Sequence, residues 1–326
     1  MQLSRPLFSG AFYSTALAAL ISLTGLTPVA QAAAPLASTA TPGFYRSMLG
    51  DFEITVLSDG TFPFPAAQML TNTSPEKVNK ALARSYLSSP VITSVNGFLV
   101  NTGNKLVLID TGCGKFFGPS LGKLLSNLQA AGYQAEQVDE IYLSHLHPDH
   151  IGGLGEGDKA VFPNATVRVD RQDAEHWLNP ANMARAPKEI QAYYERASKV
   201  LQPYVEANRL KTFDGNTELL PGIKAIASHG HTAGHSIFKL ESKGQTLVLW
   251  GDLMHVAAVQ FETPAVAIQF EENSKAATAQ RQKAYADAAQ HAYLVGAAHL
   301  SFPALGYVRK EGKGYAWTPL NYAPLP

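Results

Sequence analysis

The stretch Ser144-His145-Leu146-His147-Pro148-Asp149-His150-Ile151-Gly152-Gly153 holds three histidines and an aspartate within six consecutive positions. Neutral imidazole nitrogens and carboxylate oxygens suit zinc and related divalent metals, and placing several on one loop lowers the entropic cost of a site. The apolar residues 138–143 before it indicate a buried strand, and α/β folds place their chemistry at the carboxyl ends of strands. The stretch therefore predicts a metal site; the alternative is a histidine-rich polar surface turn.

Three further strand ends carry side chains that bind metals. A strand predicted at 223–227 runs into Ser228-His229-Gly230-His231-Thr232-Ala233-Gly234-His235, and strands predicted at 246–250 and 293–298 end at Gly251-Asp252 and at His299. Strands alternate with helices along the chain, which is typical of a layered α/β fold. The other predicted elements include helices at 119–131, 171–178 and 187–205 and strands at 91–100, 105–109, 165–169 and 265–270.

Residues 1–34 have the pattern of a secretory signal peptide. Arg5 is the only charge among them, an apolar run spans 11–26, and Ala30-Gln31-Ala32 supplies a small-x-small cleavage signal. The run falls short of the roughly 20 apolar residues that a bilayer span requires, so no stable membrane insertion is expected after cleavage. We expect an exported protein, periplasmic or secreted, in which 35–326 form a single domain.

Composition argues against a nucleic-acid partner and against an internal disulfide. The chain has 26 basic and 26 acidic residues, and this balance, without a basic run, argues against nucleic acid as a partner. Hydrophobic residues make up 46% of the sequence, which is ample for a large core. Cys113 is the single cysteine, so no internal disulfide forms, and the core or a bound metal must hold the mature chain together.

The order of these elements resembles the signature of the metallo-β-lactamase superfamily. The matching residues are Asp110 after an apolar strand, His145-x-His147-x-Asp149-His150, Gly230-His231-Thr232-x-Gly234-His235, Gly251-Asp252 and His299. The phrases around both histidine clusters, with the leader and the length, are most similar to the branch containing methyl parathion hydrolase and dihydrocoumarin hydrolase. The resemblance implies an α/β fold, the αββα four-layer sandwich, with a dinuclear metal site in a cleft at the edges of the sheets.

The resemblance also implies which residues hold the two divalent ions. It assigns His145, His147 and His231 to one ion, Asp149, His150 and His299 to the other, and Asp252 to both, with Asp149 and Asp252 serving catalysis. Zinc is the expected metal, although cobalt, manganese or iron would suit the same donors. A hydroxide held between the ions would be the nucleophile, because metal binding lowers the pKa of water from ~15.7 towards ~7.

Other histidines could act as ligands, and a serine could act as the nucleophile in place of a metal-bound hydroxide. His229 and His235 flank His231 at spacings that also permit coordination; the family pattern selects His231 and gives His235 a supporting hydrogen bond. His176 and His291 fall in predicted helices and are expected to be ordinary packed or surface residues. The sequence has no Gly-x-Ser-x-Gly elbow that would supply a competing serine nucleophile.

The substrate pocket is expected to be aromatic, since aromatic walls hold an aryl ring by stacking and apolar burial. Some of its candidate residues could instead be ordinary core. In the family comparison Leu70, His255, Ile268 and Phe270 resemble the lactonase members and imply a narrow, flat pocket. The predicted pocket residues are Leu70, Phe117, Trp177, Tyr193, His255, Ile268 and Phe270.

These features predict a metal-dependent hydrolase of small aryl lactones and esters, of which dihydrocoumarin is an example. The alternative activity is organophosphate triester hydrolysis at the same site, as the main or a side activity. A non-catalytic metal-binding module is the alternative of another class, disfavoured because seven ligands for two ions leave open coordination positions. The resemblance also suggests a homodimer.

Overall fold

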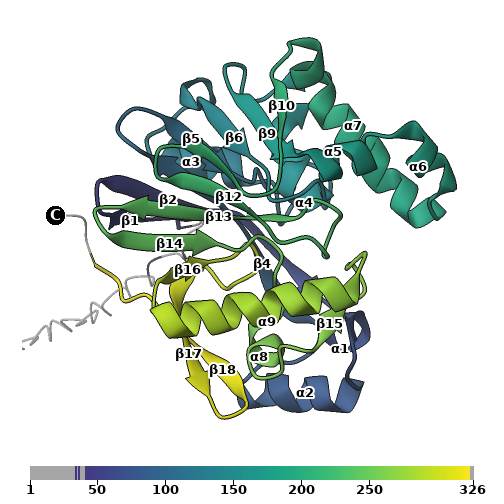
Figure 1. The fold of residues 1–326 in the computed structure, drawn as a ribbon, viewed down its shortest axis with the longest axis vertical. Helices are drawn as coiled ribbons and strands as arrows, with labels where there is room; N and C mark the ends of the chain where they lie inside the picture. The colour runs from purple at the N-terminus through teal and green to yellow at the C-terminus, as the bar shows by residue number, and fades with distance from the viewer. Residues whose placement is uncertain (1–33, 35, 37–40, 324–326) are drawn as a thin grey trace, which may run out of the picture. The chain divides into compact units, whose positions relative to one another are not determined.

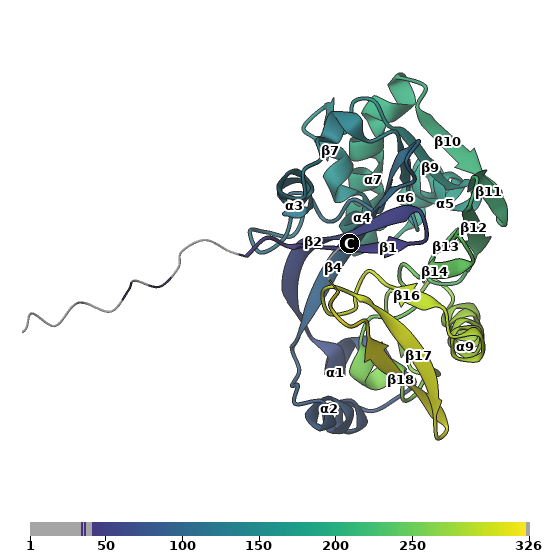
Figure 2. The same ribbon diagram turned by 90° about the vertical axis from the view of Figure 1, so that its left-hand side faces the viewer.

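Two seven-stranded sheets form the body of the computed structural model, which describes Ala34, Leu36 and residues 41–323 (Figures 1 and 2). In the first sheet the strand order is β1-β2-β4-β5-β6-β9-β10, and in the second it is β11-β12-β13-β14-β16-β17-β18. The strands of the first sheet are β1 Phe44–Leu49, β2 Phe52–Phe64, β4 Val91–Asn101, β5 Leu106–Ile109, β6 Glu140–Tyr142, β9 Thr166–Asp170 and β10 Leu210–Phe213. Those of the second are β11 Thr217–Leu220, β12 Ile223–Ala227, β13 Ser236–Ser242, β14 Gln245–Leu249, β16 Leu294–Gly296, β17 Leu305–Glu311 and β18 Gly314–Pro319.

Two small sheets and the helices complete the fold. The pairs are β3 Leu70–Thr71 with β15 Ala267–Ile268, and β7 Gly155–Glu156 with β8 Lys159–Ala160. The helices are α1 Ala66–Met69, α2 Pro75–Arg84, α3 Leu124–Ala130, α4 Pro148–Ile151, α5 Arg171–Trp177, α6 Pro180–Arg185, α7 Lys188–Glu206, α8 Ala257–Gln260 and α9 Ser274–His291.

Strand β5 shows that the first sheet is covered on both faces, by the second sheet on one side and by helices on the other. Its residues Leu-Val-Leu-Ile are all buried, as expected of a strand covered on both faces. Because side chains alternate across a strand, Val107 and Ile109 join the core between the two sheets, whereas Leu106 and Leu108 join the core beneath α3 and α7. The inter-sheet core includes Tyr142 stacked on Phe238, with ring centroids 5.9 Å apart. Helix α9 covers the other face of the second sheet (Figure 1), so the predicted αββα sandwich is confirmed.

Parallel pairing brings the functional loops to one edge. β5, β6 and β9 pair in parallel in the first sheet, and β14 pairs in parallel with β16 in the second. The loops after β5, β6, β14 and β16 therefore leave from the carboxyl ends of parallel strands, where an α/β sheet places its ligands.

Two predicted elements differ from the structure. The helix predicted at 119–131 begins only at Leu124, because Gly122 has φ +75° and the amides of Gly122 and Leu124 donate to the carboxylate of Asp59 on β2. The strand predicted at 265–270 is reduced to Ala267–Ile268. Helix α6 was not predicted; Asn179 caps it by accepting the Ala181 amide, and Pro180 follows at its first position.

The N-terminal predictions lie largely outside the described residues. The charge, the apolar run and the cleavage signal at residues 5–32 are not among them. Contacts group Thr41–Pro326 into one unit, and the division of the chain at residue 34 stays a prediction. Within the described part of the chain, no helix combines the length and apolar character needed to cross a membrane.

Candidate metal centre

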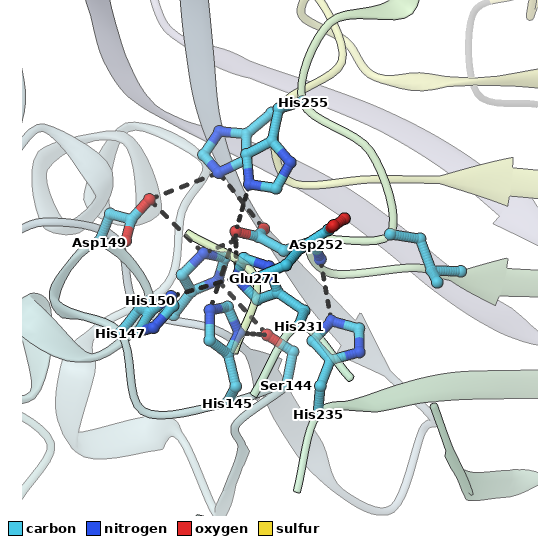
Figure 3. A network of polar contacts seen from close by, with 12 residues as sticks. Ser144, His145, His147, Asp149, His150, His231, His235, Asp252, His255 and Glu271 are labelled. Carbon is cyan, nitrogen blue, oxygen red and sulfur yellow. Dashed lines mark hydrogen bonds and ion pairs between the residues drawn. The ribbon is translucent and has the colours of Figure 1, made fainter. Parts of the chain in front are cut away.

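The first histidine loop turns sharply after β6. His147 has extended backbone (φ −70°, ψ 149°) and precedes α4, whose first residue is Pro148. Proline is favoured at that position because its fixed φ suits a helix start and it lacks an N–H that would stay unbonded there. The turn places His145 and His147 before the helix and Asp149 and His150 within it, so all four side chains reach one side of the loop (Figure 3).

The second sheet supplies the remaining candidate ligands. His231 lies between β12 and β13, Asp252 follows β14, and His299 follows β16. Gly251 has φ +51°, and a Cβ there would lie 2.8 Å from the Ser144 Cβ and 2.9 Å from the His235 Nε2. Glycine is therefore required where the strand carrying Asp252 meets the histidine loop.

The structure brings the seven predicted ligands into two groups that share Asp252. One group is His145, His147, His231 and Asp252; the other is Asp149, His150, Asp252 and His299; within each, the ligand atoms lie within 4.8 Å of one another. The two oxygens of Asp252 face different groups. Oδ2 lies 3.3 Å from His231 Nε2, whereas Oδ1 lies 3.1 Å from His150 Nε2 and 3.3 Å from His299 Nε2 (Figure 3).

Unpaired polar atoms indicate that these groups fit cations. Among the described residues, His145 Nε2, His150 Nε2 and Asp252 Oδ1 are buried without a hydrogen-bond partner. Leaving such atoms unsatisfied costs roughly 1–3 kcal/mol each. Imidazole nitrogens and carboxylate oxygens that converge in this way satisfy the donor preferences of zinc and similar ions, so each group could hold one divalent ion.

The electrostatics of the two groups differ. Burial lowers the pKa of His145 and His147 well below the usual value, and neighbouring histidines act in the same direction, so both are neutral and have free lone pairs. Burial also lowers the pKa of His299, but the Asp252 and Asp149 carboxylates outweigh it and raise the pKa to about 10. Those carboxylates thus attract positive charge, and a metal bound there would displace protons.

Hydrogen bonds behind the ligands fix their orientation. Asp110 lies 2.8 Å from His150 Nδ1 through Oδ2, which also accepts from Ser144 Oγ at 2.7 Å. His299 Nδ1 lies 3.0 Å from the Ser94 carbonyl. In both histidines Nδ1 is thereby engaged outside the site, and Nε2 faces Asp252, where it could bind a cation that displaces its proton.

His235 has both ring nitrogens engaged. Its Nε2 accepts the Asp252 amide at 3.0 Å, and its Nδ1 lies 3.1 Å from the Ser228 carbonyl. These bonds place it behind Asp252 in a supporting position, where the resemblance put it. His229 lies away from both groups, with Nε2 3.5 Å from Asp170 Oδ2. His176 contacts the Tyr194 hydroxyl at 2.7 Å.

A cavity of about 210 Å³ opens onto the candidate metal centre. Of the seven predicted pocket residues, Phe117, Tyr193, His255 and Phe270 line it. The full lining is Phe62, Phe64, Thr93, Cys113, Phe117, Leu121, His147, Asp149, Tyr193, Asp252, His255, Phe270 and His299.

The other three predicted pocket residues lie behind this lining. Leu70 and Ile268 pair across β3 and β15 and pack into the same core cluster as Phe64. Trp177 is buried, with its ring 5.2 Å from that of His147 and 4.6 Å from that of Tyr194. None of the three is in the lining of the cavity, and their part in the substrate pocket stays a prediction.

Sequence reasoning missed the lining residues contributed by the first sheet and by the loop after β5. They are Phe62, Phe64, Thr93, Cys113 and Leu121. Phe62 and Phe64 lie on either side of Pro63 at the end of β2. This alternation of aromatic residues is a sequence signal that could have placed both side chains on one face of the strand, towards the cavity.

Comparisons with known proteins agree with this geometry. Residues 91–289 match the Metallo-beta-lactamase superfamily. The solved structure described as "hydrolase AbOPH in beta lactamase superfamily" is 39% identical, with a TM-score of 0.84 over 88% of this chain and 100% of that one. "AidC, a Dizinc Quorum-Quenching Lactonase", solved with a product, is 28% identical, with a TM-score of 0.80 over 86% of this chain and 99% of that one.

A curated relative matches a shorter part of the chain. The N-acyl homoserine lactonase of Bacillus cereus is 27% identical over 127 residues, which are 39% of this chain and 42% of that protein. The match thus spans less than half of the relative's length. Together with the family match and the convergent histidine and aspartate groups, these likenesses lead to one conclusion: the chain belongs to the metallo-β-lactamase superfamily and is a metal-dependent hydrolase.

Proposed function

We propose that the protein is a dinuclear lactonase that hydrolyses small aryl lactones and esters such as dihydrocoumarin. In this proposal His145, His147 and His231 would hold one ion and Asp149, His150 and His299 the other, with Asp252 offering one oxygen to each. Zinc is the proposed metal. The observation that carries the proposal is Asp252, which presents one carboxylate oxygen to each ligand group.

Two divalent ions bound to such donors supply Lewis acidity and, at neutral pH, a hydroxide nucleophile. The residues of the chain do the rest. The neutral imidazoles of His145 and His147 leave the charge of a bound cation undiminished. Asp110 and His235 hold His150 and Asp252 in place by hydrogen bonds, so little rearrangement is required when the substrate binds. The aromatic lining excludes water from the reacting ester.

The cavity supports a small, flat substrate. Its volume of about 210 Å³ lies below the roughly 300–1,000 Å³ that is typical of drug-sized ligand sites. His255 is buried against the metal centre, with Nε2 3.1 Å from Asp252 Oδ2 and its ring stacked on His299 at 5.0 Å. It therefore occupies space beside the reacting group that one arm of a dialkyl phosphotriester would need.

Organophosphate triester hydrolysis is the second candidate, because the same cation site serves a phosphorus electrophile. Two partly exposed aromatic side chains of the cavity lining favour this second activity. Phe117 is 41% exposed and Phe270 is 37% exposed, so apolar surface extends outward where an alkoxy arm could lie. The lactonase relatives add a third substrate to compare, an N-acyl homoserine lactone.

The experiment that tests the proposal compares kcat/KM for dihydrocoumarin, N-hexanoyl homoserine lactone and methyl parathion on one preparation of known metal content. We expect dihydrocoumarin to lead, and His255→Leu to shift the ratio towards the triester by widening the cavity. A preference for methyl parathion of tenfold or more would reverse our order of substrates. If N-hexanoyl homoserine lactone led instead, the aryl specificity would be rejected and the lactonase class retained.

Asp252→Ala provides the baseline for all three substrates, since it removes the shared carboxylate. Wild-type rates no higher than those of this variant would favour the non-catalytic metal-binding module. Export by the predicted leader and homodimeric assembly belong to the same proposal. Cell fractionation and analytical ultracentrifugation test them.

A further inference from the structure

We propose that Asp59 is a positioning residue that fixes one wall of the substrate cavity and thereby sets how tightly the substrate is held. The wall is the loop 111–123 between β5 and α3. Asp59 does not touch the cavity itself. The inference rests on the proposed function only in assigning the cavity to the substrate; the clamp between Asp59 and the loop is independent of any activity.

Asp59 is buried at an irregularity in β2. The register between β2 and β4 shifts between Ser58 and Gly60, and Asp59 lies in that bulge with 1% of its surface exposed. A bulge re-aims a side chain out of the regular alternation of a strand. Here it directs a carboxylate beneath the loop 111–123.

The carboxylate binds both ends of the loop. Oδ2 accepts the amide of Cys113 at 2.9 Å and that of Gly122 at 2.9 Å, and Oδ1 accepts the amide of Leu124 at 3.1 Å. The Asp59 carbonyl accepts the Lys123 amide at 3.0 Å. Hydrogen bonds to an ionised acceptor are stronger than those between neutral groups, so one buried side chain joins the start of the loop to its end.

The fit is close enough to require glycine on the loop. A Cβ on Gly112, which has φ +73°, would lie 2.4 Å from the Asp59 Cγ. A Cβ on Gly122 would lie 2.1 Å from the Gly114 carbonyl oxygen, where the loop returns to itself. The backbone is thus shaped around the carboxylate.

The loop presents Cys113, Phe117 and Leu121 to the cavity. A separate pair of contacts joins the first residue of this loop to residues 144–153, the segment with the first histidine cluster, which we call the metal loop. The amide and the hydroxyl of Thr111 donate to the His150 carbonyl at 2.7 and 2.9 Å. Loss of Asp59 would therefore release the cavity wall but leave the contact with the metal loop in place. A substitution of Asp59 should thus weaken substrate binding and leave metal binding unchanged.

Asp59→Asn is the test, because asparagine keeps the size but has only one accepting oxygen for three amides. We expect KM to rise about tenfold, as for the loss of a buried hydrogen bond, with kcat within about twofold of wild type and metal content unchanged. Cys113, the only cysteine in the sequence and 1% exposed, reports on the loop directly. Its reaction with a maleimide should be at least about tenfold faster in the metal-loaded variant.

Asp139→Asn is the matched control. Asp139 also accepts a backbone amide, that of Leu106 at 2.8 Å, but at the opposite end of β5. It should change neither KM nor the labelling of Cys113. If Asp59→Asn lowered the melting temperature while KM and labelling stayed at wild-type values, Asp59 would only cap α3 and the inference would be wrong.

Two further outcomes are distinguishable. If wild type hydrolysed no lactone, the proposed function would fail, and labelling would still decide whether Asp59 clamps the loop. If Asp59→Asn did not fold, hydrogen exchange in wild type would decide. The amides of Cys113, Gly122 and Leu124 should then be protected together, and exchange as fast as that of an exposed loop would overturn the clamp.

Discussion

Asp110 organises the metal loop although it belongs to neither ligand group. Its backbone lies in the left-handed region, at φ +58°, which aspartate, asparagine and glycine adopt more readily than other residues. The conformation directs Oδ1 to the Ser144 amide at 2.8 Å and Oδ2 to His150 Nδ1 at 2.8 Å. One carboxylate therefore sets both the path of the loop and the ring orientation of a candidate ligand.

Asp110→Asn should weaken metal binding without removing a ligand. An asparagine amide facing His150 would set N–H against N–H or force the other imidazole tautomer. Loss of such a supporting partner typically lowers metal affinity 10–100-fold, and we expect that range for one of the two ions. Competition with a chromophoric chelator measures it, with Asp139→Asn as control. If the Asp110 variant bound both ions with wild-type affinity, Asp110 would not be the residue that orients His150 for metal binding.

At the residue scale, the ligand groups could be predicted and the cavity only in part. Each candidate ligand lies in a loop or short helix that follows an apolar strand, so the sequence predicted that metal-binding side chains meet there. The choice of His231 and the division of the ligands between two ions came from the resemblance to the superfamily. Phe62 and Phe64 line the cavity but have the same pattern as core residues, whereas Leu70 and Ile268 are core residues. Which face of an apolar residue meets a cavity depends on tertiary packing, which no local pattern encodes.

Helix α9 holds the segment that contributes His255 and Phe270 to the cavity wall. Arg281, on α9, is 1% exposed and donates to the carbonyls of Leu253, Pro264 and Val266 and to the Glu271 carboxylate. These bonds hold the chain between Asp252 and α9, which includes His255 and Phe270. A single buried guanidinium thus joins the parts of that segment that lie outside α8 and β15.

Arg281→Met should lower the free energy of unfolding by about 3–5 kcal/mol, because it leaves the Glu271 carboxylate buried and unpaired. Adding Glu271→Gln should recover part of the loss, and the two changes should be coupled by at least about 0.5 kcal/mol. Urea unfolding of the metal-loaded proteins measures both. Arg171→Met, at an exposed pair with Asp214, is the control and should show no measurable loss. Additive effects at Arg281 and Glu271 would contradict the account.

At the element scale, the sequence predicted the strands that precede the candidate ligands and the long helix α7, but it misplaced the start of α3. It did not predict six strands of the two large sheets, β1, β10, β11, β13, β17 and β18. The helical pattern reaches back to residue 119, and the true start depends on Asp59, which is remote in sequence and caps the helix from another strand. A cap of this kind has no local sequence signature. The same holds for the 265–270 segment, which Arg281 holds in irregular form.

In the whole molecule, the candidate metal centre joins the two sheets. The loop after β6 of the first sheet supplies His145, His147, Asp149 and His150, and the second sheet supplies His231, Asp252 and His299. The ligands of this centre converge only in the folded chain, so an ion that does not bind the unfolded chain should stabilise the fold by about 2.7 kcal/mol at a free concentration one hundred times its dissociation constant.

The alternation of strands and helices, with fully apolar strands such as β5, predicted a layered α/β fold. The four layers were expected only from the resemblance to the superfamily. The pairing order of the strands could not be predicted, since it depends on contacts between distant segments. Export, assembly and the choice among lactone, ester and phosphotriester depend on residues 1–34, on surfaces and on the cavity's dynamics. They stay predictions.

The central claim is that two ions, bridged by Asp252, make this protein a hydrolase. The most direct measurement titrates Zn²⁺ into chelator-treated protein while bound metal, melting temperature and dihydrocoumarin hydrolysis are followed together. We predict that activity and melting temperature rise to a plateau at two ions per chain, and that Asp252→Ala binds fewer ions and stays inactive. Full activity at one ion or none, or full activity of Asp252→Ala, would contradict the claim.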